Sequence, residues 1–193
     1  MKVTPAAGDA LIIADVQNDF LPGGSLAVPG GDEIVPVLNR YIGFFNTRGL
    51  PIFATRDWHP PDHCSFLQRG GRWPPHCIAG TAGAAFSSSL ELPSHAYIIS
   101  KGTDREKEAY SGFEGTELNT LLLSSRTCRL FIGGLTAEYC VRGTVEDALQ
   151  YHYMTFVLQD AIRAIDANSN LSRTLEEMKR LGAVPVDFES LGT

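Results

Sequence analysis

Six short runs of apolar residues recur along the chain. They cover 10–14, 51–55, 96–100, 130–134, 155–158 and 184–186. A continuous apolar run of this length is typical of a strand that is covered on both faces, whereas a strand with one exposed face alternates apolar and polar residues. The last run is short and contains Pro185, so we expect it to lie at an edge of a sheet.

Between and after these runs, apolar residues recur every three or four positions, as they do on one face of a helix. This spacing predicts helices at 34–45, 118–122, 141–149 and 171–181. Strands that alternate with helices imply right-handed crossovers and parallel pairing. We therefore predict a Rossmann-like α/β fold with three layers, α/β/α, around a mainly parallel six-stranded sheet. A length of 193 residues suits a single domain over 1–193.

Composition and charge narrow the class of protein. Hydrophobic residues make up 44% and charged residues 20%, which is typical of a globular protein and not of a disordered one. The 16 basic and 22 acidic residues give a net charge of −6, without a Lys/Arg cluster, so we expect no nucleic-acid partner. No leader-like or membrane-length apolar segment is evident, and we expect a cytoplasmic protein that does not bind a membrane.

Two stretches lack sustained periodicity. Residues 58–95 are rich in proline and glycine and also carry tryptophan and histidine, which favours a functional loop. Residues 102–116 have a charged half followed by Tyr110 and Phe113, and we interpret this segment as a candidate lid.

Chemically distinctive residues follow the predicted strands. Asp15, Asp57 with His59, and Lys101 come at the ends of the first three runs, and the fourth leads through a Gly-Gly turn to Cys140. The ligand site of an open parallel sheet lies beyond the carboxyl ends of its strands. We therefore expect an acid, a cation, a thiol and metal-type ligands at one edge. Taken singly, Asp15 could equally be a residue that only forms a turn, and Lys101 could be a solvated surface residue.

Cys140 differs from the other three cysteines, Cys64, Cys77 and Cys128, because a helical segment begins beside it. The first turn of a helix favours a thiolate, and a neighbouring Lys101 would lower the thiol pKa further. Backbone N–H groups there could also stabilise an oxyanion, which indicates acyl transfer at an amide or ester. The alternative is a small buried residue that only packs.

Asp57 and His59 point to the same side of an extended segment, and His76 could join them from the loop. A carboxylate with imidazoles suits Zn²⁺, Fe²⁺ or Mn²⁺, with positions left open for water or a substrate nitrogen. The alternative is a histidine-rich surface loop.

Six motifs in this order resemble the nicotinamidase/pyrazinamidase branch of the isochorismatase-like cysteine hydrolases, and together they span most of the chain. They are Asp15-Val16-Gln17-Asn18-Asp19-Phe20, Arg56-Asp57-Trp58-His59-Pro60, Trp73-Pro74-Pro75-His76-Cys77, Ser100-Lys101-Gly102, Tyr110-Ser111-Gly112-Phe113-Glu114-Gly115 and Gly134-Leu135-Thr136-Ala137-Glu138-Tyr139-Cys140-Val141.

The resemblance implies a catalytic role for three residues. Cys140 would be the nucleophile, Asp15 the proton acceptor and later donor, and Lys101 the cation that holds the other two in place. The family forms a thioester with release of ammonia, and water then hydrolyses the thioester.

The resemblance also implies one divalent metal ion per chain, with zinc favoured over iron or manganese. Asp57, His59 and His76 would be its ligands, and the metal would orient the substrate by its pyridine nitrogen. His63 is left open, either as a fourth ligand or as a hydrogen-bonding neighbour of the ligands.

Further residues are implied around the substrate. Phe20, Trp73 and Tyr110 match positions that border the aromatic ring. Thr136 stands where the family has a residue after a cis peptide, and its backbone N–H would join that of Cys140 in an oxyanion hole.

The expected activity is hydrolysis of nicotinamide to nicotinate and ammonia, a step of pyridine nucleotide (NAD) salvage, with pyrazinamide as a second small aromatic amide substrate. The nearest rival is a related cysteine amidohydrolase for an N-carbamoyl or ureido substrate, which needs no ring-binding metal. Cys140 argues against isochorismatase activity, and the complete Asp/Lys/Cys set argues against a non-catalytic module. Assembly into a homo-oligomer is left open.

Overall fold

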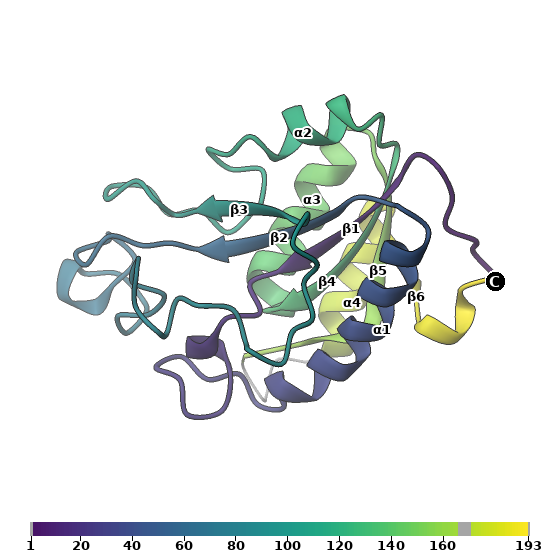
Figure 1. Cartoon of the computed structure of the whole chain (residues 1–193). Coiled ribbons are helices and arrows are strands. Elements are labelled where there is room, and N and C mark those ends of the chain that lie inside the picture. Colours follow the sequence, from purple (N-terminus) through teal and green to yellow (C-terminus); the bar gives the residue numbers. More distant parts are fainter. Residues whose placement is uncertain (1, 166–170, 193) are drawn as a thin grey trace.

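The computed structural model describes residues 2–165 and 171–192 and contains a six-stranded sheet in that part of the chain (Figure 1). Every neighbouring pair of strands is parallel, in the order β3-β2-β1-β4-β5-β6. The strands are β1 (Asp9–Ala14), β2 (Ile52–Asp57), β3 (Tyr97–Lys101), β4 (Arg129–Leu135), β5 (Met154–Arg163) and β6 (Val184–Val186). The predicted parallel sheet is confirmed, with the last strand at an edge.

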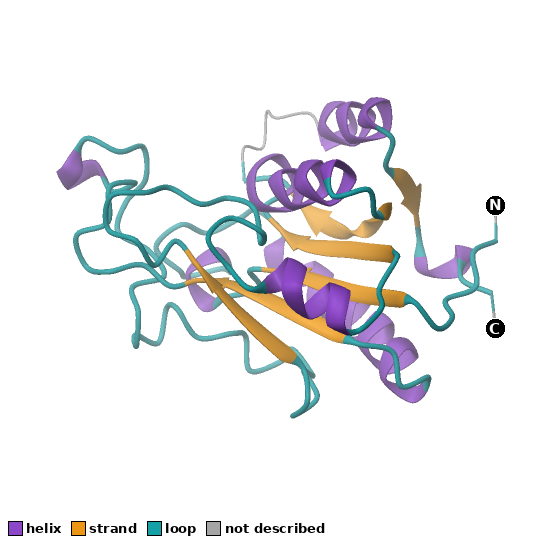
Figure 2. Cartoon of the chain, turned by 90° about the horizontal axis from the view of Figure 1, so that it is seen from above, coloured by secondary structure: helices purple, strands orange, loops and turns teal. Residues whose placement is uncertain are grey.

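The helices lie on both faces of the sheet, which confirms the three layers (Figure 2). They are α1 (Ile34–Thr47), α2 (Leu118–Ser124), α3 (Arg142–Gln150) and α4 (Leu171–Leu181). α1 packs on one face, against a core that includes Leu11 and Ile13. The other three pack on the opposite face, against a core that includes Ile12. Because β1 is buried on both sides, its sequence is continuously apolar.

One strand is longer than its sequence predicts. The apolar run at 155–158 is only the first part of β5, which continues to Arg163. The pairing of β4 with β5 shifts register between Ile132 and Gly134, and the later part of β5 then pairs with the end of β4. Polar residues at the shift interrupt the apolar run, so the sequence alone hides the second half of the strand.

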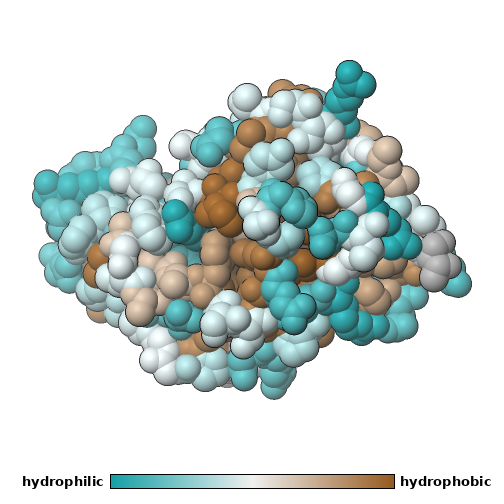
Figure 3. Space-filling view, in the orientation of Figure 1, coloured by the Kyte–Doolittle hydropathy of each residue, from teal (hydrophilic) through white to brown (hydrophobic). Residues whose placement is uncertain are grey.

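The segment 102–116 and the first part of 58–95 lie beyond the carboxyl ends of the strands, at the left of Figure 1. Residues 58–95 form an extended loop with one short helical turn, Leu67–Arg69, and the last part of this loop returns beside α1, where Asn39 bonds to Ser89 and Glu91, to the start of β3. The left end of the molecule is mostly hydrophilic on the face shown in Figure 3, whereas hydrophobic surface gathers near the middle. In the described part of the chain, no helix has the length and apolar character needed to cross a membrane.

Candidate active site

The site forms where the order of the strands reverses. The chain runs outward from β1 to β3 on one side and from β4 to β6 on the other, so the ends of β1 and β4 diverge at a switch point. Asp15 directly follows β1, and its backbone lies in the left-handed region, with φ 50°. Gly134 has φ 124°, and a Cβ there would lie 2.1 Å from the carbonyl oxygen of Ala14. Glycine therefore lets β4 approach β1 closely beside the site.

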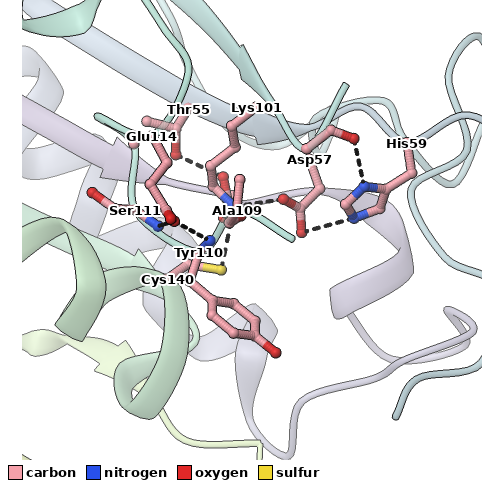
Figure 4. A network of polar contacts seen from close by, with 12 residues as sticks. Thr55, Asp57, His59, Lys101, Ala109, Tyr110, Ser111, Glu114 and Cys140 are labelled. Carbon is pink, nitrogen blue, oxygen red and sulfur yellow. Dashed lines mark hydrogen bonds and ion pairs between the residues drawn. The ribbon is translucent and has the colours of Figure 1, made fainter. Parts of the chain in front are cut away.

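Lys101 lies at the centre of this site, with a fully buried side chain (Figure 4). Its Nζ is 2.9 Å from Asp15 Oδ2 and 2.5 Å from Asp57 Oδ1. It also donates to the carbonyl oxygen of Ala109 at 3.2 Å and lies 3.5 Å from Cys140 Sγ. Burial alone would lower the pKa of Lys101, but the two carboxylates outweigh it and raise this pKa well above its usual value. Lys101 is therefore a fixed cation.

Asp15 is held beside the thiol by contacts to both of its carboxylate oxygens. Thr55 Oγ1 donates to Asp15 Oδ1 at 2.6 Å, while Oδ2 faces Lys101. The Asp15 and Cys140 side chains lie within 4.8 Å of one another at their polar atoms. Burial raises the pKa of Asp15, although the Lys101 ammonium opposes this shift. A carboxylate with a raised pKa is suited to take up and return a proton.

Cys140 lies in a π-helical turn, Ala137–Val141, that leads directly into α3. The peptide bond between Leu135 and Thr136 is cis, as the resemblance implies. Burial raises the pKa of the Cys140 thiol well above its usual value, and the lowering by Lys101 does not compensate. Lys101 thus lowers the thiol pKa as expected, but burial, together with the carboxylates of Asp15 and Asp57, raises this pKa by more.

The two histidines beside Asp57 are oriented by backbone carbonyl groups. His59 Nδ1 is 2.9 Å from the carbonyl oxygen of Gly102, and His76 Nδ1 is 2.8 Å from that of Pro74. A carbonyl oxygen only accepts, so each Nδ1 donates, and a neutral ring keeps its lone pair on Nε2. Those two Nε2 atoms lie 3.6 and 3.9 Å from Asp57 Oδ2.

This buried group of Asp57, His59 and His76 fits a divalent metal ion. Two lone pairs and a carboxylate oxygen that face one another repel, and a cation at their centre would remove the repulsion. Burial would raise the pKa of Asp57, but neighbouring positive charge, above all the Lys101 ammonium, outweighs it and lowers this pKa, which keeps the carboxylate charged. Burial lowers the pKa of His76, which favours the neutral ring.

His63 lies beside this group without joining it. Its ring stacks on His59, with centroids 4.2 Å apart. Its Nδ1 is 2.7 Å from Ser65 Oγ and its Nε2 is 2.8 Å from the carbonyl oxygen of Lys107. Both ring nitrogens thus have protein partners, and this geometry favours the hydrogen-bonding alternative over ligation.

A small cavity opens beside the Cys140 thiol and His76. It is lined by Phe20, Leu26, Asp57, Trp73, His76, Tyr110, Thr136, Tyr139, Cys140 and Ile165. The three aromatic residues proposed from the sequence are thus brought together here. Phe113 is instead buried in the core on the α2 side, and closure of 102–116 over a ligand stays a prediction.

Sequence reasoning missed three residues that shape the site. Gln17 Oε1 accepts from the backbone N–H of Asp57 at 2.7 Å, and its Nε2 donates to the carbonyl oxygen of Asp57 at 2.8 Å. The Gln17 side chain therefore hydrogen-bonds to the backbone at the end of β2, at a point where β1 has already ended. Thr55 positions Asp15, and Tyr139 packs edge-on against Trp73. Gln17 and Tyr139 lie inside two of the motifs that carry the family resemblance, and this position was the only feature of the sequence that could have indicated a role for them.

The fold agrees with the comparisons to known proteins. The model of the isochorismatase domain matches residues 9–190, and the chain belongs to this family. It is 35% identical over 213 residues to a nicotinamidase of Acinetobacter baylyi, a match that covers 99% of this chain and 98% of that protein.

Two solved structures are similar over nearly the whole chain. A pyrazinamidase of Pyrococcus horikoshii in complex with zinc has a TM-score of 0.90 and 49% identity, covering 94% of this chain and 99% of that one. PnC1 of L. infantum in complex with nicotinate has a TM-score of 0.91 and 36% identity, covering 100% of this chain and 99% of that one.

Gly102→Ala is expected to lower zinc affinity by about 10- to 100-fold, the usual loss when a group that orients a metal ligand is disturbed. A Cβ at this position would lie 2.5 Å from His59 Cε1 and 2.7 Å from Nδ1, so the ring must move. Competition with a chromophoric chelator measures the affinity.

Gly115→Ala is the matched control. Gly115 has φ 66° against 62° for Gly102, but a Cβ at Gly115 would meet no atom within 4 Å. Both variants carry the same backbone strain, and only Gly102→Ala disturbs His59. Equal zinc affinities in the two variants would contradict the proposal that the contact between His59 and Gly102 orients a metal ligand.

Proposed function

We propose that the protein is a metal-containing cysteine amidohydrolase that converts nicotinamide to nicotinate and ammonia. The observation that carries this proposal is the shared carboxylate of Asp57. Its Oδ1 belongs to the Lys101 and Cys140 cluster, while its Oδ2 belongs to the histidine cluster. A thiol and a nitrogen-binding site therefore lie at a fixed separation in one cavity, as a small ring that carries both a nitrogen and an amide requires.

The first half of the reaction forms a thioester. Asp15 takes the thiol proton as Cys140 Sγ attacks the amide carbon, and the carbonyl electron pair moves to the oxygen. The backbone N–H groups of Thr136 and Cys140 stabilise this oxyanion. When the carbonyl re-forms, the bond to nitrogen breaks, and Asp15 returns the proton to the leaving ammonia.

The second half consumes one water molecule. Asp15 takes one proton from the water as its oxygen attacks the thioester carbon, and the bond to Cys140 Sγ then breaks to release nicotinic acid, which loses the other water proton to solvent and becomes nicotinate at neutral pH. The thiolate regains the proton from Asp15. Throughout, Lys101 keeps its charge and holds the carboxylates of Asp15 and Asp57 in place, because its own pKa lies far above neutral pH.

Asp57, His59 and His76 would hold one divalent metal ion per chain, with zinc favoured over iron or manganese by the ligand set. When bound, the ion would supply a Lewis-acid position for the ring nitrogen. Phe20, Trp73 and Tyr110, which line the same cavity, would border the ring and exclude water from it. Pyrazinamide carries the same amide on a similar ring and is the second proposed substrate.

The rival reading, an amidohydrolase for N-carbamoyl or ureido substrates, would use the same Asp15, Lys101 and Cys140. This reading assigns no role to His59 and His76 or to the aromatic residues that line the cavity. All four cysteines lie in the described part of the chain and are free thiols. We therefore also propose a cytoplasmic location, where thiols stay reduced and nicotinate can enter pyridine nucleotide salvage.

Purified protein is expected to release ammonia from nicotinamide and to contain about one metal ion per chain, measured on the same sample. No release from nicotinamide together with no stoichiometric metal would favour the rival reading. No release from nicotinamide or pyrazinamide by metal-loaded protein would overturn the proposal.

Cys140→Ala is expected to lower kcat by about 10⁴-fold or more, because the nucleophile is lost. Its metal content should stay unchanged, since the thiol is not one of the three proposed ligands. Cys64→Ala removes a half-buried thiol outside the cavity and serves as the control, with full activity expected. Loss of metal from Cys140→Ala would show that the thiol is a ligand.

His76→Ala is expected to raise KM and to lower kcat, because the metal ion that is proposed to orient the substrate ring loses one of its three ligands. Steady-state kinetics and metal analysis of the purified variant measure both effects. His63→Asn is the comparison, and it should keep about one metal ion per chain if His63 is not a ligand. An unchanged KM in His76→Ala would argue against contact between the ring and this group.

A further inference from the structure

The hydroxyl of Thr136 is a polar group without a partner in the free protein. Thr136 is only 4% exposed, and its Oγ1 has no hydrogen-bond partner among the described residues. A buried hydroxyl without a partner destabilises the free protein, because it has lost its hydrogen bonds to water. Thr136 also lines the cavity next to Cys140, so a bound molecule is in a position to supply the missing partner.

Thr127 allows a direct comparison. It is 7% exposed, and its Oγ1 likewise lacks a hydrogen-bond partner in the part of the chain that the structure describes. It follows α2, where its backbone N–H donates to the carbonyl oxygen of Leu122, and it does not line the cavity. The two threonines therefore share burial and the missing partner, and only one of them adjoins the thiol.

The covalent structure of threonine keeps the hydroxyl close to the backbone N–H of the same residue. In a threonine only Cα and Cβ separate the backbone nitrogen from Oγ1, so both donors can reach one bound oxygen. The backbone N–H of Thr136 is one of the two donors proposed above for the oxyanion. A carbonyl oxygen has two lone pairs for those donors, and the tetrahedral oxyanion has a third.

We propose that the Thr136 hydroxyl is a third donor to the oxyanion and thus a catalytic residue, an inference that rests on the proposed function. As Cys140 Sγ bonds to the amide carbon, the carbonyl electron pair moves to oxygen and the thiol proton passes to Asp15. The hydroxyl then donates to the new oxyanion. Because this bond is strongest at the transition state, it contributes to kcat more than to KM.

Thr136→Val tests the inference, since valine keeps the shape of the side chain and removes the hydroxyl. With nicotinamide, kcat is expected to fall by roughly 10- to 100-fold, with KM within about twofold of the wild-type value. Thr136→Ser keeps the hydroxyl and should retain most of the activity. Thr127→Val is the matched control and should match the wild type. Urea unfolding should show no loss of stability in either valine variant, because neither hydroxyl has a partner in the free protein.

A second measurement uses pyridine-3-carbaldehyde, which the Cys140 thiol can add to without a leaving group. The Sγ–C bond forms, the carbonyl electron pair moves to oxygen, and the adduct resembles the tetrahedral intermediate. Its inhibition constant should rise in Thr136→Val by about the same factor as kcat falls, whereas the inhibition constant of the planar product nicotinate should not change.

Wild-type-like kcat and aldehyde affinity in Thr136→Val would overturn the inference. So would a change confined to KM and nicotinate affinity, which would mean that the hydroxyl contacts the substrate away from the reacting oxygen. An inactive wild-type protein would instead be a failure of the proposed function.

Discussion

The Lys101 ammonium is fully buried between the carboxylates of Asp15 and Asp57, and the arrangement of the whole site depends on it. A buried charge is stable only when it is paired and hydrogen-bonded, and here one cation satisfies two anions. The three strands that end at the site, β1, β2 and β3, each contribute one of these groups. Their parallel pairing brings the ends of the strands, and with them the three groups, together.

One consequence is that the two halves of the site are mechanically linked. Asp57 uses one oxygen for Lys101 and presents the other to His59 and His76, while Gln17 fixes its backbone on both sides. A shift of the histidine cluster would therefore disturb Lys101 and, through it, the thiol. This linkage is a physical reason why a nitrogen-binding group and a nucleophile can keep one separation suited to one small ring.

A second consequence concerns the thiol. The same burial that makes the Lys101 ion pairs strong raises the pKa of the Cys140 thiol, which favours its protonated form. The proton must move during the reaction, and Asp15, whose pKa is also raised, lies beside it. The site thus relies on proton transfer between Cys140 and Asp15, which are both buried, rather than on a thiolate that is permanently charged.

Most of the fold could be predicted from the sequence because strands buried on both faces leave long apolar runs, and helices leave regular spacing. The second half of β5 could not, since a register shift admits polar residues. Strand ends were sufficient to predict that Asp15, Asp57, Lys101 and Cys140 would meet. The pairing of Gln17 with Asp57 and the π-helical turn at Cys140 depend on local backbone geometry that residue types do not reveal.

The measurement that tests the central role of the ammonium most directly is the free energy of unfolding of Lys101→Met in urea near neutral pH. Removal of one partner from a buried ion pair costs about 3–5 kcal/mol, because the opposite charge is left unpaired. We predict a loss of that size, and partial recovery in Lys101→Met/Asp15→Asn, which removes one of the two unpaired carboxylates. A Lys101→Met protein as stable as the wild type would contradict the account.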